Sequence, residues 1–104
     1  MPAPNLLSSL AGLSFRGHDA REAVQNLEVG EELTIEREPS NQYHGNAVRV
    51  IAADVHVGYI ERNVADTMAV WYDEGYDYRC IVDDIPADWR KPLLRLEPIA
   101  PEHT

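Results

Sequence analysis

The sequence has few of the residues on which several common functions depend. It contains a single cysteine, Cys80, so it cannot form an intramolecular disulfide. Only one of its nine basic residues is a lysine, and its 18 acidic residues give a formal net charge of −9. It has no run of about 18 apolar residues, the minimum for a membrane-spanning helix. The negative charge argues against indiscriminate binding of nucleic acid, which needs a positive field to displace counterions.

Groups suited to catalysis or metal binding are scattered along the chain. The four histidines, His18, His44, His56 and His103, show no spacing typical of a metal site. The sequence has no phosphate-binding loop, nucleophile elbow or Ser/His/Asp order. Cys80 lies in an apolar, strand-like run and is better explained as a buried small side chain than as a nucleophile. We therefore expect no enzymatic activity, no cofactor and no metal, and the single cysteine favours a reducing, intracellular setting, cytoplasmic or in the nucleoid or nucleus.

The remaining sequence predicts one small domain of short strands and two short helices. A chain of 104 residues, 44% of them apolar, is long enough for one modest core. Helical spacing of apolar residues predicts one helix after a cap at Asp19 and another after a cap at Asn63. Apolar alternation and flanking turn signals predict strands over residues 10–16, 31–37, 47–51, 55–60, 76–82 and 93–97.

The order of these elements, β-α-β-β-β-α-β-β, indicates a mainly β (α+β) fold. Short antiparallel strands with two short helices are typical of a small β-barrel. Residues 52–54 most simply join two strands as a hairpin. The predicted domain covers residues 10–97, and residues 1–9 and 98–104 are expected to be flexible tails.

One loop, between the strands predicted at residues 31–37 and 47–51, carries more polar groups than a turn requires. Pro39 fixes its own backbone angle, and asparagine and glycine in the loop tolerate unusual backbone angles. Tyr43 and His44 have no such role in turning the chain. Loops with several hydrogen-bonding groups on a rigid β scaffold usually carry binding residues. The sequence therefore predicts a binding site at this loop.

Motifs over roughly residues 10–72 closely resemble the HIRAN domain family. They are Phe15-Arg16-Gly17, Arg37-Glu38-Pro39-x-Asn41-x-Tyr43-x-x-Asn46-Ala47-Val48-x-Val50 and Val57-Gly58-Tyr59-Ile60-x-Arg62. The resemblance implies an OB-like barrel of about six strands with two helices. In family members fused to helicase-like DNA-remodelling ATPases, the domain grips a 3′ end of single-stranded DNA. This chain is similar to a standalone or excised form of that domain.

The resemblance also implies roles for particular residues. Arg16 matches an arginine that the family places against the DNA backbone. Tyr43 matches an aromatic residue in the pocket for the terminal nucleotide, and Tyr59 stands where the family often has an aromatic residue or histidine near that pocket. Asn41 and Asn46 match loop residues that hold the shape of the pocket.

Two positions differ from the pattern of the DNA-end binders. Those members carry an aspartate after the pocket tyrosine, where it accepts a bond from the terminal hydroxyl, whereas this chain has His44. A neutral imidazole can accept through one nitrogen, but a protonated one only donates. Gly17 stands where those members have an aromatic residue after the arginine, so one stacking surface is absent.

A site for single-stranded DNA needs flat side chains and cations, and stacking contributes about 1–3 kcal/mol per base. Arg37 and Arg62 would add cations to that of Arg16 if these groups converge on one face of the barrel. Alternatively, Arg37 and Arg49 are cross-strand partners of neighbouring glutamates, in surface ion pairs that contribute little. Tyr59 is equally well explained as a core or edge-strand residue.

Two functions of different class fit these observations. The first is a non-catalytic module that binds single-stranded DNA or a 3′ DNA end, weakly, in DNA repair, replication or a mobile-element context. The second is an acidic protein-interaction module, with DNA mimicry as a special case. In that alternative a basic, nucleic-acid-processing partner docks on carboxylates at Asp73, Glu74, Asp77, Asp83 and Asp84.

Overall fold

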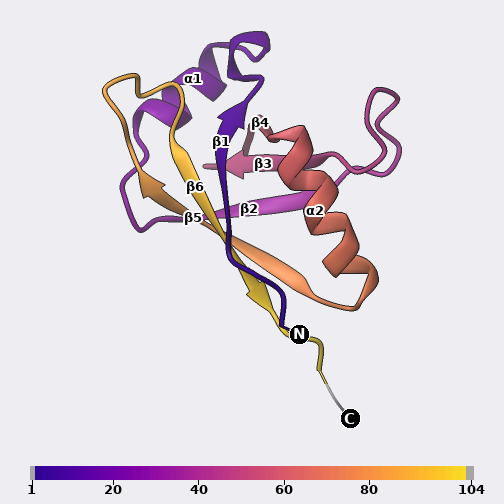
Figure 1. Ribbon diagram of the computed structural model, residues 1–104. Helices are drawn as coiled ribbons and strands as arrows, with labels where there is room; N and C mark the ends of the chain where they lie inside the picture. Colours follow the sequence, from indigo (N-terminus) through magenta and orange to yellow (C-terminus); the bar gives the residue numbers. More distant parts are fainter. Residues whose placement is uncertain (1, 103–104) are drawn as a thin grey trace.

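The computed structural model describes residues 2–102, in which six strands close into an antiparallel barrel with two helices on its outside (Figure 1). The strand order around the barrel is β1-β4-β3-β2-β5-β6. The elements are β1 (Leu6–Ala11), the 3-10 helix η1 (Leu13–Phe15), α1 (His18–Gln25), β2 (Glu32–Arg37), β3 (Val48–Ala52), β4 (Val55–Ile60), α2 (Arg62–Asp73), β5 (Asp77–Asp84) and β6 (Leu93–Ile99). The predicted fold class, a small mainly β barrel with two short helices, is confirmed. None of the described helices is long and apolar enough to cross a membrane.

The barrel forms because its strands alternate between buried and exposed positions. In β3, Val48 and Val50 are buried, and Arg49 between them lies on the outer face. The interior also holds Leu94 and Leu96 of β6, which are completely buried. Burying a side chain of this size stabilises the folded state by about 1.5–3 kcal/mol. The core therefore fills the barrel, and polar groups occupy its outer face.

The lone thiol lies in this core. Cys80 is completely buried in β5, as expected for a small structural side chain. Burial raises the pKa of its thiol to about 12, so the sulfur stays protonated at neutral pH. A protonated, buried thiol is a poor nucleophile, which confirms the interpretation of Cys80 as a packing residue.

The N-terminal boundary predicted from the sequence is wrong. The first strand covers Leu6–Ala11 instead of residues 10–16, so residues 6–9 belong to the barrel instead of a flexible tail. Gly12, with φ of 80°, then turns the chain into η1. Two serines break the apolar pattern by which this strand would be predicted. Ser8 points inward, and its hydroxyl accepts a hydrogen bond from the Glu61 amide at 2.9 Å. This bond lets a polar residue occupy an inward position.

Other boundaries differ by smaller amounts. The last strand extends to Ile99, so residues 98–99 also belong to the barrel and not to a tail. Met1 and residues 103–104, which include part of both predicted tails, lie outside the described residues. The helices begin before the predicted caps, α1 after Gly17 and α2 after Glu61. The predicted β3–β4 hairpin is confirmed, and its turn residues Ala53 and Asp54 have φ of 50° and 62°.

Candidate functional site

A row of polar side chains crosses the outer face of β2, β3 and β4. The strand register places Glu36 beside Arg49, and Arg49 beside Tyr59. Arg49 Nε donates to Glu36 Oε2 at 3.0 Å. Arg49 is therefore held in a cross-strand ion pair, the alternative considered for it from the sequence.

Two contacts hold the Tyr59 side chain, one at its hydroxyl and one at its ring. Its hydroxyl donates to Glu38 Oε1 at 3.0 Å, and its ring meets the His56 ring edge-on, with centroids 4.9 Å apart. Burial, together with the bond to the Glu38 carboxylate, raises the pKa of the phenol. The ring is therefore neutral at physiological pH and held in one orientation on the outer face of β4.

His56 is a site residue that the sequence analysis counted only among scattered histidines. Its Nε2 lies 3.0 Å from the Gly58 carbonyl oxygen. Because a carbonyl only accepts, Nε2 must carry the proton, and Nδ1 of the neutral ring carries none. Burial and the nearby charge of Arg16 lower the pKa of His56. The imidazole is therefore uncharged at neutral pH and presents an aromatic surface.

Arg16 follows η1 and reaches the same group. Its Nε donates to the His56 carbonyl oxygen at 3.2 Å. Within residues 2–102, no carboxylate forms an ion pair with Arg16. A surface hollow of about 540 Å³ lies between Arg16, Phe15, His56 and the first turn of α1. The guanidinium therefore keeps donors free for an anion entering this hollow.

Phe15 borders the same hollow and is 89% exposed. A phenylalanine so exposed gains little from folding, so its ring is available to a ligand. The sequence analysis noted Phe15 in the motif without giving it a role. We call the group of Phe15, Arg16, His56 and Tyr59 the Arg16 site; it combines one unpaired cation with three aromatic rings.

The loop between β2 and β3 is shaped by Asn41. Its Oδ1 accepts from the backbone amides of Tyr43 at 2.9 Å and His44 at 3.0 Å. Its Nδ2 donates to Glu38 Oε1 at 2.9 Å, and this bond is the main reason that the pKa of Glu38 is lowered. Since Glu38 also accepts from Tyr59, Asn41 connects the loop to the Arg16 site.

The three candidate residues in this loop have different surroundings. Tyr43 is 80% exposed and stands out from the loop. His44 and Asn46 instead face α2, where Asp66 Oδ1 accepts from His44 Nε2 at 2.7 Å and from Asn46 Nδ2 at 3.1 Å. These two residues tie the loop to α2 at Asp66.

Two predicted cations lie away from the Arg16 site. The Arg37 guanidinium lies over the Tyr72 ring of α2, 4.7 Å from the ring centroid, and not against a neighbouring glutamate. Arg62 is the first residue of α2 and lies near Asp66. The structure thus brings Arg16 together with Tyr59, connects Tyr43 to them through the loop, and places Arg37 and Arg62 beside α2.

The bond between the loop and α2 leads to a prediction. Asp66→Ala removes the acceptor shared by His44 and Asn46, so we expect the loop to open more often. Loss of these bonds should speed amide hydrogen exchange at Tyr43 and His44 about three- to tenfold. Asp73→Ala, at the other end of α2, is the matched control and should leave both rates unchanged. Equal rates in the Asp66 variant and wild type would contradict this role.

The hydrogen bonds between the loop and Asp66 should weaken in acid. The hydrogen bonds from His44 and Asn46 lower the pKa of Asp66 in the folded protein. Its stabilising contribution is therefore present above the unfolded pKa, about 3.9, and is lost as the pH falls through the lower folded value. Loop protection against exchange should accordingly fall in acid below about pH 4.

Comparison with known proteins identifies one matching family model and two similar solved structures. The sequence model of the HIRAN domain matches residues 5–96 of the chain. The fold is similar to the crystal structure of a protein from Lactobacillus plantarum, with 25% identity, a TM-score of 0.74 and coverage of 89% of this chain and 95% of that one. It is also similar to the crystal structure of the HIRAN domain of human HLTF, with 17% identity, a TM-score of 0.66 and coverage of 88% and 72%. No curated protein sequence matches the chain.

Proposed function

Because the chain belongs to the HIRAN domain family, whose members bind DNA, we propose that it is a non-catalytic module that binds single-stranded DNA, with a preference for a 3′ end. The observation that carries this proposal is Arg16, an exposed guanidinium without a carboxylate partner among residues 2–102, beside the rings of His56 and Tyr59. A guanidinium fork suits a phosphate, and exposed rings suit bases. The role fits an intracellular process such as DNA repair, replication or mobile-element transfer.

Each group of the Arg16 site has a distinct part in this proposal. Arg16 donates to a backbone phosphate through the guanidinium nitrogens that the His56 carbonyl leaves free. Phe15 offers the most exposed ring of the site and takes the place of the aromatic residue that other members carry where this chain has Gly17. Tyr43, on the loop, provides a second exposed ring for the terminal nucleotide.

Recognition of the 3′ hydroxyl should be modest in this chain. The position held by aspartate in DNA-end binders is His44, and its ring is engaged with Asp66. A terminal hydroxyl therefore finds no carboxylate at that position. We expect a free 3′ end to bind only a few-fold more tightly than a blocked one, since one neutral hydrogen bond contributes about 0.5–1.5 kcal/mol.

Fluorescence anisotropy with short oligonucleotides tests the proposal. Oligonucleotides with a free 3′ hydroxyl and with a 3′ phosphate are titrated with protein at low and at physiological salt. We expect binding at low salt that weakens as salt rises, with a slope of about −0.7 for each phosphate contacted. If neither oligonucleotide binds at low salt, the proposal is wrong. The acidic-module alternative expects that result, together with salt-sensitive binding of a basic protein.

A further inference from the structure

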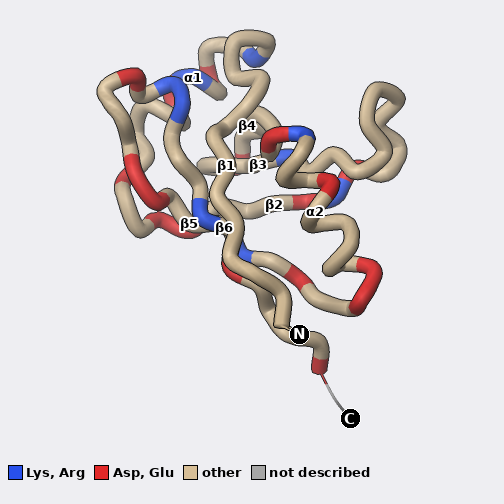
Figure 2. The backbone as a smooth tube through the Cα atoms, in the orientation of Figure 1, with Lys and Arg blue, Asp and Glu red and all other residues tan. Residues whose placement is uncertain are grey.

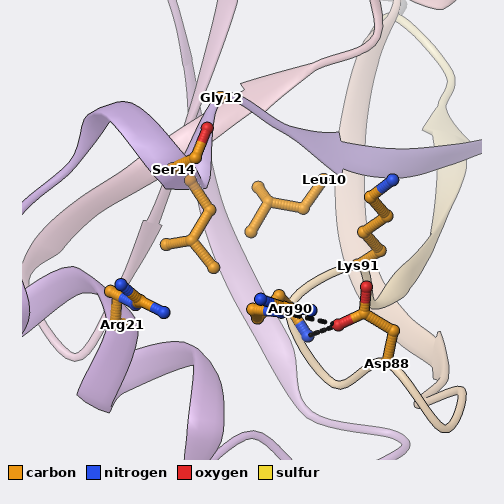
Figure 3. Close-up of a pocket in the computed structure, with 8 residues that line it drawn as sticks. Leu10, Gly12, Ser14, Arg21, Asp88, Arg90 and Lys91 are labelled. Atoms are coloured by element: carbon orange, nitrogen blue, oxygen red, sulfur yellow. Dashed lines mark hydrogen bonds and ion pairs between the residues drawn. The ribbon is translucent and has the colours of Figure 1, made fainter.

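A second basic hollow lies next to the Arg16 site. It has a volume of about 460 Å³ and is bordered by η1, by Arg21 of α1, and by Arg90 and Lys91 of the loop between β5 and β6. Figure 3 shows the Arg21 guanidinium entering from the helix and Arg90 approaching from the opposite loop. We call the group of Arg21, Arg90 and Lys91 the basic cleft. Neither the family motifs nor the Arg16 site includes these residues.

The basic cleft has an excess of positive charge. Among the described residues, Asp88 is the one carboxylate that lines it, and its Oδ1 accepts from Arg90 Nε at 2.8 Å. That bond lowers the pKa of Asp88, so this carboxylate stays charged and holds Arg90 in place. Within residues 2–102, Arg21 and Lys91 form no ion pair. Two unpaired cations thus border one hollow on a chain with a net charge of −9, and Figure 3 shows the Lys91 ammonium extending away from the Arg21 and Arg90 guanidinium groups.

The basic cleft shares Arg21 with a hollow that Arg16 also lines. Arg21 also lines a hollow of about 560 Å³ together with Arg16, and this hollow passes along α1 beside Trp89. Figure 2 shows basic positions on α1 and the adjoining β5–β6 loop with acidic positions among them, and further acidic positions along β5 and at the turn after α2. An anionic chain leaving Arg16 in this direction therefore reaches the cation of Arg21 and then that of Arg90, and the carboxylates of Glu22 and Asp88 also line this path.

We propose that the basic cleft binds a backbone phosphate of the same DNA strand whose end occupies the Arg16 site. The inference rests on the proposed function and adds the path of the strand: from Arg16, past Arg21, to Arg90 and Lys91. Arg21 and Arg90 can each donate two hydrogen bonds to phosphate oxygens, and Lys91 adds a point charge. A strand long enough to reach the cleft gains affinity that a dinucleotide does not.

The test compares two ligand lengths in one double variant. Arg21→Gln with Lys91→Gln removes both unpaired cations, and both side chains are exposed, so the fold should be retained. Against an oligonucleotide of about eight nucleotides, we expect affinity to fall about tenfold and the salt slope to become shallower by about 0.7 per phosphate lost. Dinucleotide affinity should not change. Arg79→Gln, an exposed arginine on β5, is the control for net charge.

The outcomes separate this inference from the proposed function. If wild type binds the longer oligonucleotide and the double variant binds it equally well, the basic cleft makes no contact and the inference fails alone. If Arg79→Gln weakens binding as much as the double variant does, the effect is one of net charge, and the inference fails. If wild type binds neither ligand, both proposals fail.

Discussion

Arg16→Ala is expected to weaken binding of single-stranded DNA by about ten- to 150-fold. The guanidinium has one bond to the protein, to the His56 carbonyl oxygen, and among residues 2–102 no ion pair competes with a phosphate for it. A hydrogen bond to a charged group contributes about 1.5–3 kcal/mol, which corresponds to that range of affinity. Anisotropy at low salt measures the change, and the salt slope should become shallower by about 0.7.

A matched control separates a local contact from a loss of charge. Arg79→Ala removes the same charge from β5, which does not pair with β4, and should change affinity by less than about twofold. Arg16→Lys keeps the charge but loses the fork, so an intermediate affinity is expected. Equal losses in Arg16→Ala and Arg79→Ala would remove the basis for placing DNA at the Arg16 site.

The pKa of His56 provides a second measure of the effect of Arg16→Ala. Burial and then the charge of Arg16 lower the pKa of His56 in the folded protein. Without that positive charge, the protonated imidazole is less disfavoured, so the pKa of His56 should rise in Arg16→Ala. An NMR titration of His56 measures this shift without DNA. An unchanged pKa would show that Arg16 does not lie against His56 in solution.

The barrel could be predicted from the sequence because the pattern of buried residues follows the strands. Alternation in β3 and β5 places Val50 and Cys80 inside, and the turn at Ala53 and Asp54 has the residue count of a tight hairpin. The N-terminal boundary could not be predicted in this way. Ser8 is buried because its hydroxyl accepts the Glu61 amide, a contact between residues 53 positions apart.

The site was only partly predictable, for two different reasons. His56 joins Tyr59 because the β3–β4 register shifts at Val50, and such an irregularity depends on strand pairing and not on local sequence. The placement of Arg37 could have been predicted from the sequence. Arg37 continues the spacing of the inward-facing Leu33, so it lies on the side of the strand that meets Tyr72 and not on the face of Tyr59. The sequence analysis had grouped Arg37 with Arg16 because of its charge alone.

Gly58 explains how β4 approaches β1 closely enough to close the barrel. A Cβ atom at Gly58 would lie 2.4 Å from the Ala11 carbonyl oxygen and 3.0 Å from Leu10 Cδ1. The two strands pair only through Leu10 with Ile60 and Ala11 with Tyr59. Because the obstructing atom is backbone, rotating a side chain cannot relieve the clash, and β1 must move.

We therefore expect Gly58→Ala to lower the free energy of unfolding by about 1–3 kcal/mol, the range for overpacked interiors. For a domain of this size the melting temperature should fall by about 5–20 °C. Gly45→Ala is the control, because its Cβ would meet nothing within 4 Å and its φ is not positive. That substitution should leave the melting temperature unchanged or raise it slightly. Thermal denaturation followed by circular dichroism compares the two variants.

The same substitution tests whether barrel closure positions the Arg16 site. Tyr59 follows Gly58 directly, and His56 donates to the Gly58 carbonyl, so any displacement of β4 moves both rings relative to Arg16. At a temperature where Gly58→Ala is still folded, DNA affinity should therefore fall, whereas Gly45→Ala should bind as wild type does. A Gly58→Ala variant as stable as wild type would show that β1 moves away from β4 without lowering the free energy of unfolding. Full DNA affinity in a destabilised variant would show that the site does not depend on this closure.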